Sequence, residues 1–94
     1  MRLVRSGRYS SNLDMIVDFI KAENPSAALA MFDTIELQIA KLADHPNIGR
    51  VGRVEGTREL VITRTPYIVG YRIVGDTVEI LTVLHGARQW PVGL

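Results

Sequence analysis

The chain has 94 residues, enough for one domain with a single small core, and we expect that domain to span residues 1–94. Hydrophobic residues make up 47% and charged residues 22%, as in ordinary globular proteins, and the absence of cysteine excludes disulfides and thiolate metal sites. No apolar run approaches the roughly 20 residues of a membrane-spanning helix. Met1–Arg5 leads into small and polar residues, unlike a signal peptide, so the expected compartment is the cytoplasm.

The net charge of +1 conceals an uneven distribution of charged residues. Residues 46–94 carry six basic and four acidic residues, and all six basic residues are arginine. A planar guanidinium can grip a phosphate or a carboxylate in two places, which a lysine cannot do. The excess fits either a solvated sheet face with a few ion pairs or a binding surface for an acidic partner.

The N-terminal part predicts a short strand followed by a helix. Leu3 and Val4 suit a strand at a sheet edge, which the Ser-Gly pair after them would break. Ser11–Asp14 has the pattern of a capping box, in which the serine and the acid accept hydrogen bonds from free N–H groups. This helix is expected to end near Ala22. Its apolar stripe, at helical spacing, consists of Leu13, Ile16, Val17 and Ile20.

A second helix is predicted to begin at Asn24 and Pro25. Asparagine is a favoured N-cap, and proline suits the first helical position because its missing N–H has no partner there. The helix should end before Pro46, because proline disfavours helical geometry in the preceding residue. Since the turn between the two helices is short, they are expected to form an antiparallel hairpin. The apolar stripe of the second helix consists of Ala28, Phe32, Ile35, Ile39 and Leu42.

The rest of the chain predicts three strands. Residues 49–56 contain three glycines and are expected to form a loop. A period of two then predicts strands at 58–63, 67–74 and 77–84, with a two-residue hairpin turn at Gly75-Asp76. The expected fold class is α+β: an N-terminal short strand, an α-helical hairpin and a three-stranded antiparallel meander. The hairpin should pack on one face of an antiparallel sheet.

Histidine is the first candidate for chemistry. His85 lies at the end of the last predicted strand, three residues before Arg88, and is a candidate general acid or base near neutral pH. The alternative is a histidine that hydrogen-bonds a loop. His45 lies at a helix end, where interaction with the helix dipole accounts for it without a function.

The arginines of the second half are candidates for a binding or catalytic surface. Several guanidinium groups together could stabilise a phosphate and its developing charge, or hold an acidic peptide segment. On the strand at 58–63, even-numbered residues share one face and odd-numbered residues the other. Neither face is cleanly polar, so either could meet the helices. Taken alone, an arginine on a strand usually faces solvent.

Aromatic residues and known motifs add little chemistry. Tyr67 and Tyr71 share one face of a strand, which favours core packing over base stacking. Trp90 follows the last strand and could either cap the core or stack on a partner. The sequence contains no glycine-rich phosphate loop, metal-ligand spacing or nucleophile motif, so no metal or cofactor is expected.

Three segments together resemble the ParE/RelE superfamily of bacterial toxins: Gly49–Val61, Pro66–Arg72 and Val83–Pro91. The resemblance covers nearly the whole chain, because the predicted helical hairpin also fits. It implies the toxin half of a type II toxin–antitoxin module. Its expected partner is a small antitoxin of ParD or RelB type that wraps the toxin through an extended or helical tail, in a hetero-oligomer without a membrane. One departure is Asn12, which stands where the family often has an acid.

The superfamily has two branches with different targets. The ParE-like branch blocks DNA gyrase without catalysing a reaction, whereas the RelE-like branch cleaves mRNA in the ribosome, typically with lysines, arginines and a C-terminal tyrosine. This chain has no lysine after Lys41 and no tyrosine after Tyr71, and its low net charge is unfavourable for gripping ribosomal RNA. The resemblance therefore favours gyrase inhibition and growth arrest. A third interpretation is an interaction domain that has lost activity.

Each branch implies its own site residues. A reduced nuclease site would use three arginines to stabilise phosphate and one histidine to transfer a proton: Arg58, Arg64, Arg88 and His85. In the ParE-like interpretation, the meander and the tail contact the target or the antitoxin through Arg50, Arg53, Arg72 and Trp90. Neither set implies a metal or a cofactor.

Overall fold

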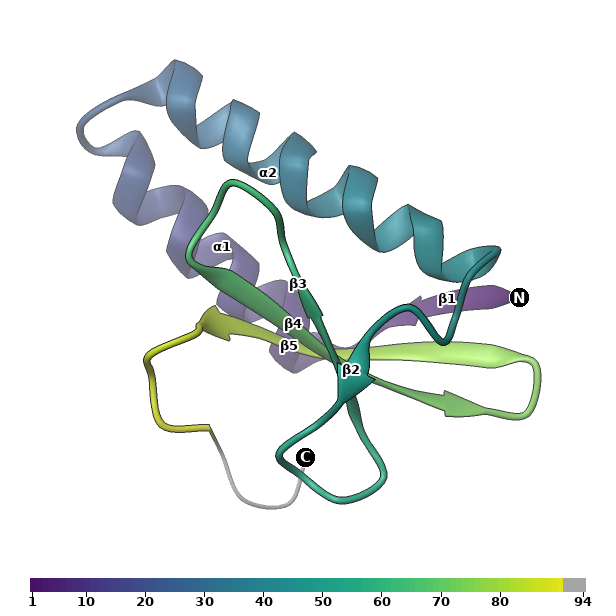
Figure 1. Cartoon of the computed structure of the whole chain (residues 1–94). Coiled ribbons are helices and arrows are strands. Elements are labelled where there is room, and N and C mark those ends of the chain that lie inside the picture. The colour runs from purple at the N-terminus through teal and green to yellow at the C-terminus, as the bar shows by residue number, and fades with distance from the viewer. Residues whose placement is uncertain (91–94) are drawn as a thin grey trace.

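Two helices cover one side of a five-stranded sheet (Figure 1). The computed structural model describes residues 1–90, and Pro91, which closes the last of the three motifs, lies outside the described residues. The elements in chain order are β1 (Arg2–Arg5), α1 (Gly7–Lys21), α2 (Pro25–Ala40), the 3₁₀ helix η1 (Lys41–Ala43), β2 (Arg50–Val51), β3 (Arg58–Val61), β4 (Tyr67–Val74) and β5 (Thr77–His85). This arrangement confirms the expected α+β class and the helical hairpin.

Helix α1 begins earlier than the capping-box pattern predicts. Ser6, and not Ser11, is the N-cap, since its hydroxyl oxygen accepts a hydrogen bond from the Tyr9 N–H at 3.0 Å. Strand β5 fixes the same serine. The Ser6 N–H donates to the carbonyl of Ile80 at 2.9 Å, and its hydroxyl donates to the carbonyl of Leu81 at 2.9 Å. The start of α1 is therefore set by a tertiary contact that the local pattern does not contain.

Helix α2 begins as predicted. The side chain of Asn24 accepts a hydrogen bond from the Ala27 N–H at 3.0 Å, and Pro25 lies in the first turn. Phe32 departs from the predicted stripe, because 40% of it stays exposed. The buried members of the stripe are Ala28, Ile35, Ile39 and Leu42. Within residues 1–90, neither helix is long and apolar enough to cross a membrane.

The sheet is mixed, and not antiparallel throughout as expected. Its strand order is β1-β5-β4-β3-β2, so β1 and β2 form its edges. Strand β1 runs parallel to β5, starting with Arg2 opposite Thr77. Parallel pairing needs a long crossover, which the helical hairpin and the intervening strands supply. Strand β2 lies in the glycine-rich segment predicted to be a loop, and pairs with β3 through Arg50 and Glu59.

Strands β3, β4 and β5 form the predicted antiparallel meander. Strand β3 ends at Val61, two residues before the predicted end, where the chain turns toward β4. The turn between β4 and β5 is the predicted one. Its glycine, Gly75, has a φ of 60°, in the left-handed region that glycine adopts without steric cost.

A β-bulge interrupts the pairing of β4 with β5. Thr82 lies opposite Gly70 and Ile80 lies opposite Tyr71, which leaves Leu81 as an extra residue on β5. An extra residue shifts the alternation of faces by one. As a result, the second half of β5 presents odd-numbered residues to the helices, and its even-numbered residues reach the far face of the sheet.

One hydrophobic core fills the space between the hairpin and the sheet. Tyr9 from α1 and Tyr71 from β4 are among its buried members, and Tyr67 packs against it. The predicted core role of both meander tyrosines is thus confirmed. Leu60 packs against the same core and Ile62 belongs to it. The even-numbered face of β3 therefore meets the helices, and Glu59 points to the other side.

Candidate functional site

The side of the sheet away from the helices carries a buried carboxylate. Glu59 is 2% exposed, and it lies between Arg50 of β2 and Arg53 of the loop that follows β2. Arg50 Nη2 donates to its Oε1 at 3.0 Å. Arg53 donates to its Oε2 through Nε at 3.0 Å and through its backbone N–H at 2.8 Å. Burial by itself would raise the pKa of Glu59, but the hydrogen bonds from Arg53 and Arg50 outweigh it and hold this pKa below its ordinary value.

Trp90 completes this group. The Arg53 guanidinium lies 4.4 Å from the centroid of its indole ring, a cation–π contact. Trp90 is 8% exposed and packs with Ile68 and Leu84, so it caps the far side of the sheet. A Cβ on Gly70 would lie 2.8 Å from the indole Cζ3, so this glycine leaves the space that the ring occupies. The far-face cluster, as we call it, consists of Glu59, Arg50, Arg53 and Trp90.

Arg58 holds the loop that follows the helices. Its Nη1 donates to the carbonyl of Gly49 at 2.8 Å. Beside it, the Tyr71 hydroxyl donates to the carbonyl of Pro46 at 2.7 Å and accepts from the Gly49 N–H at 2.9 Å. Burial raises the pKa of Tyr71, so this hydroxyl keeps its proton for the bond to Pro46. In this structure, Arg58 fastens backbone to the edge of the sheet.

Arg64 occupies the turn between β3 and β4. Its φ of 68° lies in the left-handed region, which is unusual for a residue with a side chain. Gln38 of α2 fixes this turn, because its Oε1 accepts from the Thr63 N–H at 2.9 Å and its Nε2 donates to the Thr63 carbonyl at 3.3 Å. Arg64 lines an open groove of about 650 Å³ along α2, together with Leu37 and Lys41.

Arg72 lies apart from the far-face cluster. Its Nε is 3.2 Å from Oε1 of Glu79, and both side chains are partly exposed. An exposed ion pair of this kind contributes little to stability. Of the four residues predicted to contact a partner, the structure therefore brings three together, Arg50, Arg53 and Trp90. Their role in binding a partner stays a prediction.

His85 and Arg88 lie in the turn after β5. Nδ1 of His85 accepts a hydrogen bond from the Ala87 N–H at 3.1 Å, and the His85 carbonyl accepts from the Arg88 N–H at 2.9 Å. The imidazole also meets the ring of Tyr67 edge-on, at a centroid distance of 6.0 Å. The loop hydrogen bond predicted as one alternative for His85 is therefore present. Of the other two residues in the predicted nuclease set, Arg58 lies farther along the sheet, opposite Tyr71. Arg64 lies in the turn between β3 and β4, at the same end of the sheet as His85.

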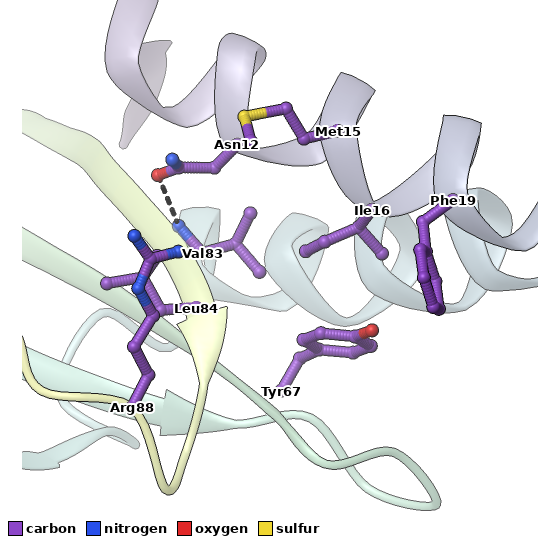
Figure 2. Close-up of a pocket in the computed structure, with 8 residues that line it drawn as sticks. All are labelled: Asn12, Met15, Ile16, Phe19, Tyr67, Val83, Leu84 and Arg88. Carbon is purple, nitrogen blue, oxygen red and sulfur yellow. Dashed lines mark hydrogen bonds between the residues drawn. The ribbon is translucent and has the colours of Figure 1, made fainter.

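Arg88 also borders an apolar cleft between α1 and the ends of β4 and β5 (Figure 2). Met15 and Phe19 of α1 are 67% and 80% exposed at its rim. Asn12 lies at one end, where its Oδ1 accepts hydrogen bonds from the Thr82 hydroxyl and, at 3.4 Å, from the Val83 N–H. The cleft has a volume of about 170 Å³ and is lined by Asn12, Met15, Ile16, Phe19, Tyr67, Val83, Leu84 and Arg88. Within residues 1–90, no group of three or more acidic or histidine side chains is placed to hold a metal ion.

Comparison with known proteins assigns this architecture to a family. The family profile described as the ParE toxin of the type II toxin–antitoxin system parDE matches residues 4–90. The chain belongs to the ParE toxin family. The superfamily that the three motifs indicate is thereby confirmed, and the protein is a ParE-type toxin of a type II toxin–antitoxin system.

This ParE-family toxin is similar to several known proteins. Y4kP of Sinorhizobium fredii is 47% identical over 79 residues, which cover 84% of this chain and 81% of that protein. The toxin RelE2 of Caulobacter vibrioides is 31% identical over 87 residues, covering 93% of this chain and 97% of RelE2. In a structure of the chromosomal ParDE toxin–antitoxin system from P. aeruginosa, one chain matches with a TM-score of 0.81 and 28% identity, covering 88% of this chain and 92% of that one. The E. coli RelBE toxin–antitoxin complex contains a chain of the same fold, with a TM-score of 0.66, 11% identity and coverage of 93% and 98%.

Proposed function

We propose that this ParE-family toxin arrests growth by inhibiting DNA gyrase, that an antitoxin of ParD type neutralises it, and that both act in the cytoplasm. The far-face cluster is the observation that carries the choice of target. One buried carboxylate, Glu59, pairs with both Arg50 and Arg53 and cancels the charge of one of them. Capture of a polynucleotide backbone needs free cations for phosphate contacts. A surface whose cations are already held suits contact with a folded protein better.

Three further arginines support the same choice. The Arg58 guanidinium donates hydrogen bonds to backbone carbonyls. Arg72 forms an ion pair with Glu79, and Arg5 of β1 forms one with Glu36 at 2.9 Å. With a net charge of +1, the toxin has a weak electrostatic attraction for RNA. Non-catalytic inhibition of a protein target makes no demand on free phosphate-binding groups.

A RelE-like, ribosome-dependent mRNA endonuclease is the second candidate. The turn after β5 favours it, because His85 and Arg88 are exposed within three residues of each other. In that mechanism His85 would transfer a proton, and Arg88 would stabilise the phosphate with help from Arg58 and Arg64. The similarity to RelE2 of C. vibrioides fits this candidate as well as the first.

Exposed apolar side chains on the hairpin support the antitoxin. Met15, Phe19, Leu29 and Leu37 are each between 64% and 80% exposed. Apolar surface of this kind commonly marks a protein interaction site. The P. aeruginosa structure is of a ParDE system, so that family member is known with its antitoxin. A partner that binds the folded form of the toxin and not the unfolded form will raise the stability of the toxin.

Two parallel assays test the target. Purified toxin is added to a gyrase supercoiling reaction and, separately, to ribosomes translating a defined mRNA. We expect inhibition of supercoiling and no cleavage. Cleavage that disappears in a His85→Ala, Arg88→Ala double variant would overturn the proposal. Inactivity in both assays, with no growth arrest on expression, would favour an inactive interaction domain. The antitoxin is tested by the melting temperature of the toxin, which should rise when the antitoxin is added.

A further inference from the structure

A polar hollow lies beside the apolar cleft of Figure 2. It has a volume of about 410 Å³, and Arg8, Arg88, Gln89 and Trp90 are among the residues that line it. Asn12, Leu84 and Arg88 line both the hollow and the cleft. In Figure 2, Arg88 extends from the turn after β5 across Leu84 toward Asn12. The two spaces are therefore parts of one continuous surface.

The hollow is cationic. Its ionised lining residues are Arg8 from α1 and Arg88 from the turn after β5, and no acidic residue among the described ones lines it. Both side chains are exposed. Within residues 1–90, neither arginine takes part in an ion pair, unlike Arg5, Arg53 and Arg72. These two guanidinium groups are thus available to an anion from outside.

Two further N–H donors of the lining side chains have no acceptor in the part of the chain that the structure describes. Asn12 uses its oxygen for Thr82 and Val83, which leaves its NH₂ group to donate elsewhere. Trp90 is 8% exposed, and its buried Nε1–H has no acceptor among the described residues. Buried N–H groups nearly always have a partner. The described lining of the hollow thus offers hydrogen-bond donors that could bind an acceptor from another molecule.

We propose that the hollow receives a carboxylate side chain of the antitoxin, and that the cleft receives an apolar side chain of the same segment. This assignment rests on the antitoxin partner of the proposed function. Paired guanidinium groups bind a carboxylate through several charge-assisted hydrogen bonds. Met15, Phe19 and Tyr67 offer the apolar contact in the cleft. A short segment that carries both side chains spans the two sites by crossing Asn12.

The apolar cleft argues for a peptide over a nucleic acid. A phosphate backbone would use Arg8 and Arg88 but would leave Met15 and Phe19 in water. A peptide with an acidic and an apolar side chain fills both spaces, which adjoin each other through Asn12, Leu84 and Arg88. The acidic side chain adds specificity and speeds association, because opposite charges steer the encounter.

Matched peptides test this assignment. The probes are short amidated peptides that carry leucine at varied spacing from either glutamate or glutamine, titrated against the full-length toxin by isothermal calorimetry. We expect the best glutamate peptide to bind about tenfold more tightly than its glutamine counterpart, since a charged partner is the stronger acceptor. The Arg8→Gln, Arg88→Gln double variant should abolish this difference. Arg2→Gln, on an exposed arginine of β1 outside both spaces, should keep it.

Several outcomes would overturn the assignment. They are equal binding of the glutamate and glutamine peptides, no binding by any peptide of the set, and a preference for glutamate that survives in the double variant. Tighter binding of a single-stranded RNA oligonucleotide would also overturn it. Melting temperatures check that the variants are folded, and the single variants replace the double one if it is not. The gyrase assay is independent, so a toxin that binds the glutamate peptide but spares gyrase refutes the choice of target alone.

Discussion

The two faces of the sheet are held by different interactions. Toward the helices, contact is apolar and involves many side chains, with Ile35, Ile39 and Ile80 fully buried. On the far face, a carboxylate, two arginines and one indole join the loop before β3 to the segment that leads from β5 to Trp90. Apolar burial is spread over a whole surface, whereas the far-face cluster depends on Glu59 alone for its charge balance. Loss of the apolar core should unfold the toxin. Loss of the far-face cluster should release only the segments that this cluster holds.

Truncation of the core gives the largest expected effect. Ile35→Ala removes fully buried methyl groups from α2, and we expect a loss of about 2–5 kcal/mol in the free energy of unfolding. Urea denaturation followed by circular dichroism measures this value. Leu37→Ala, on the same helix but 70% exposed, is the control and should change stability by less than about 0.5 kcal/mol. Equal losses in the two variants would show that the hairpin does not pack as described.

A smaller effect is expected where Trp90 meets the sheet. Gly70→Ala places a methyl group 2.8 Å from the indole, so the ring must move, at a cost of about 1–3 kcal/mol. Trp90 is the only tryptophan of the chain, so its fluorescence should shift toward that of exposed indole. Gly7→Ala is the control, because nothing lies within 4 Å of the added Cβ. An unchanged emission spectrum in Gly70→Ala would contradict the packing of the far face.

The charge of Glu59 should give the smallest effect, visible mainly in acid. The folded-state pKa of Glu59 is below its ordinary value of about 4.3, so its ion pairs stabilise the fold above that pH. This contribution is lost as the pH falls through the lowered pKa. We expect Glu59→Gln to cost about 1–2 kcal/mol at pH 7 and to weaken the acid dependence of stability. Glu79→Gln, in an exposed pair, should leave that dependence unchanged. Identical pH profiles for all three proteins would refute a structural role for the Glu59 charge.

Local patterns predicted the elements whose causes are local. The second helix follows from the cap at Asn24 and from its apolar stripe, and the β4–β5 hairpin follows from Gly75. Elements fixed by distant contacts were missed. The start of α1 depends on Ser6 bonding to β5, and β2 forms because Arg50 pairs with Glu59 across a glycine-rich loop. The direction of β1 likewise depends on a strand at the far end of the sequence.

The candidate site was predicted in part. Alternation along β3 separates Glu59 from Leu60, but a carboxylate on the second face of a strand normally faces solvent. Its burial requires a loop to fold back with Arg53 and a tryptophan to cover both, and no periodic pattern encodes such a meeting. The sequence shows that the meander contains several arginines. It does not show which of them already pair with carboxylates of the same chain. In the sequence, Asn12 is only a departure from a family pattern. The structure shows that its Oδ1 accepts a hydrogen bond from the Thr82 hydroxyl.

The adjacency of β1 and β5 has a consequence for the synthesis of the toxin. Strand β1 pairs with β5, and the Ser6 hydroxyl donates a hydrogen bond to the carbonyl of Leu81, 75 residues later in the chain. A nascent polypeptide therefore cannot complete this sheet until residues 77–85 have been synthesised. A chain that ends before Thr77 lacks β5, and β1 then has no strand to pair with. Closure of the sheet is therefore the step that follows synthesis of every other described helix and strand.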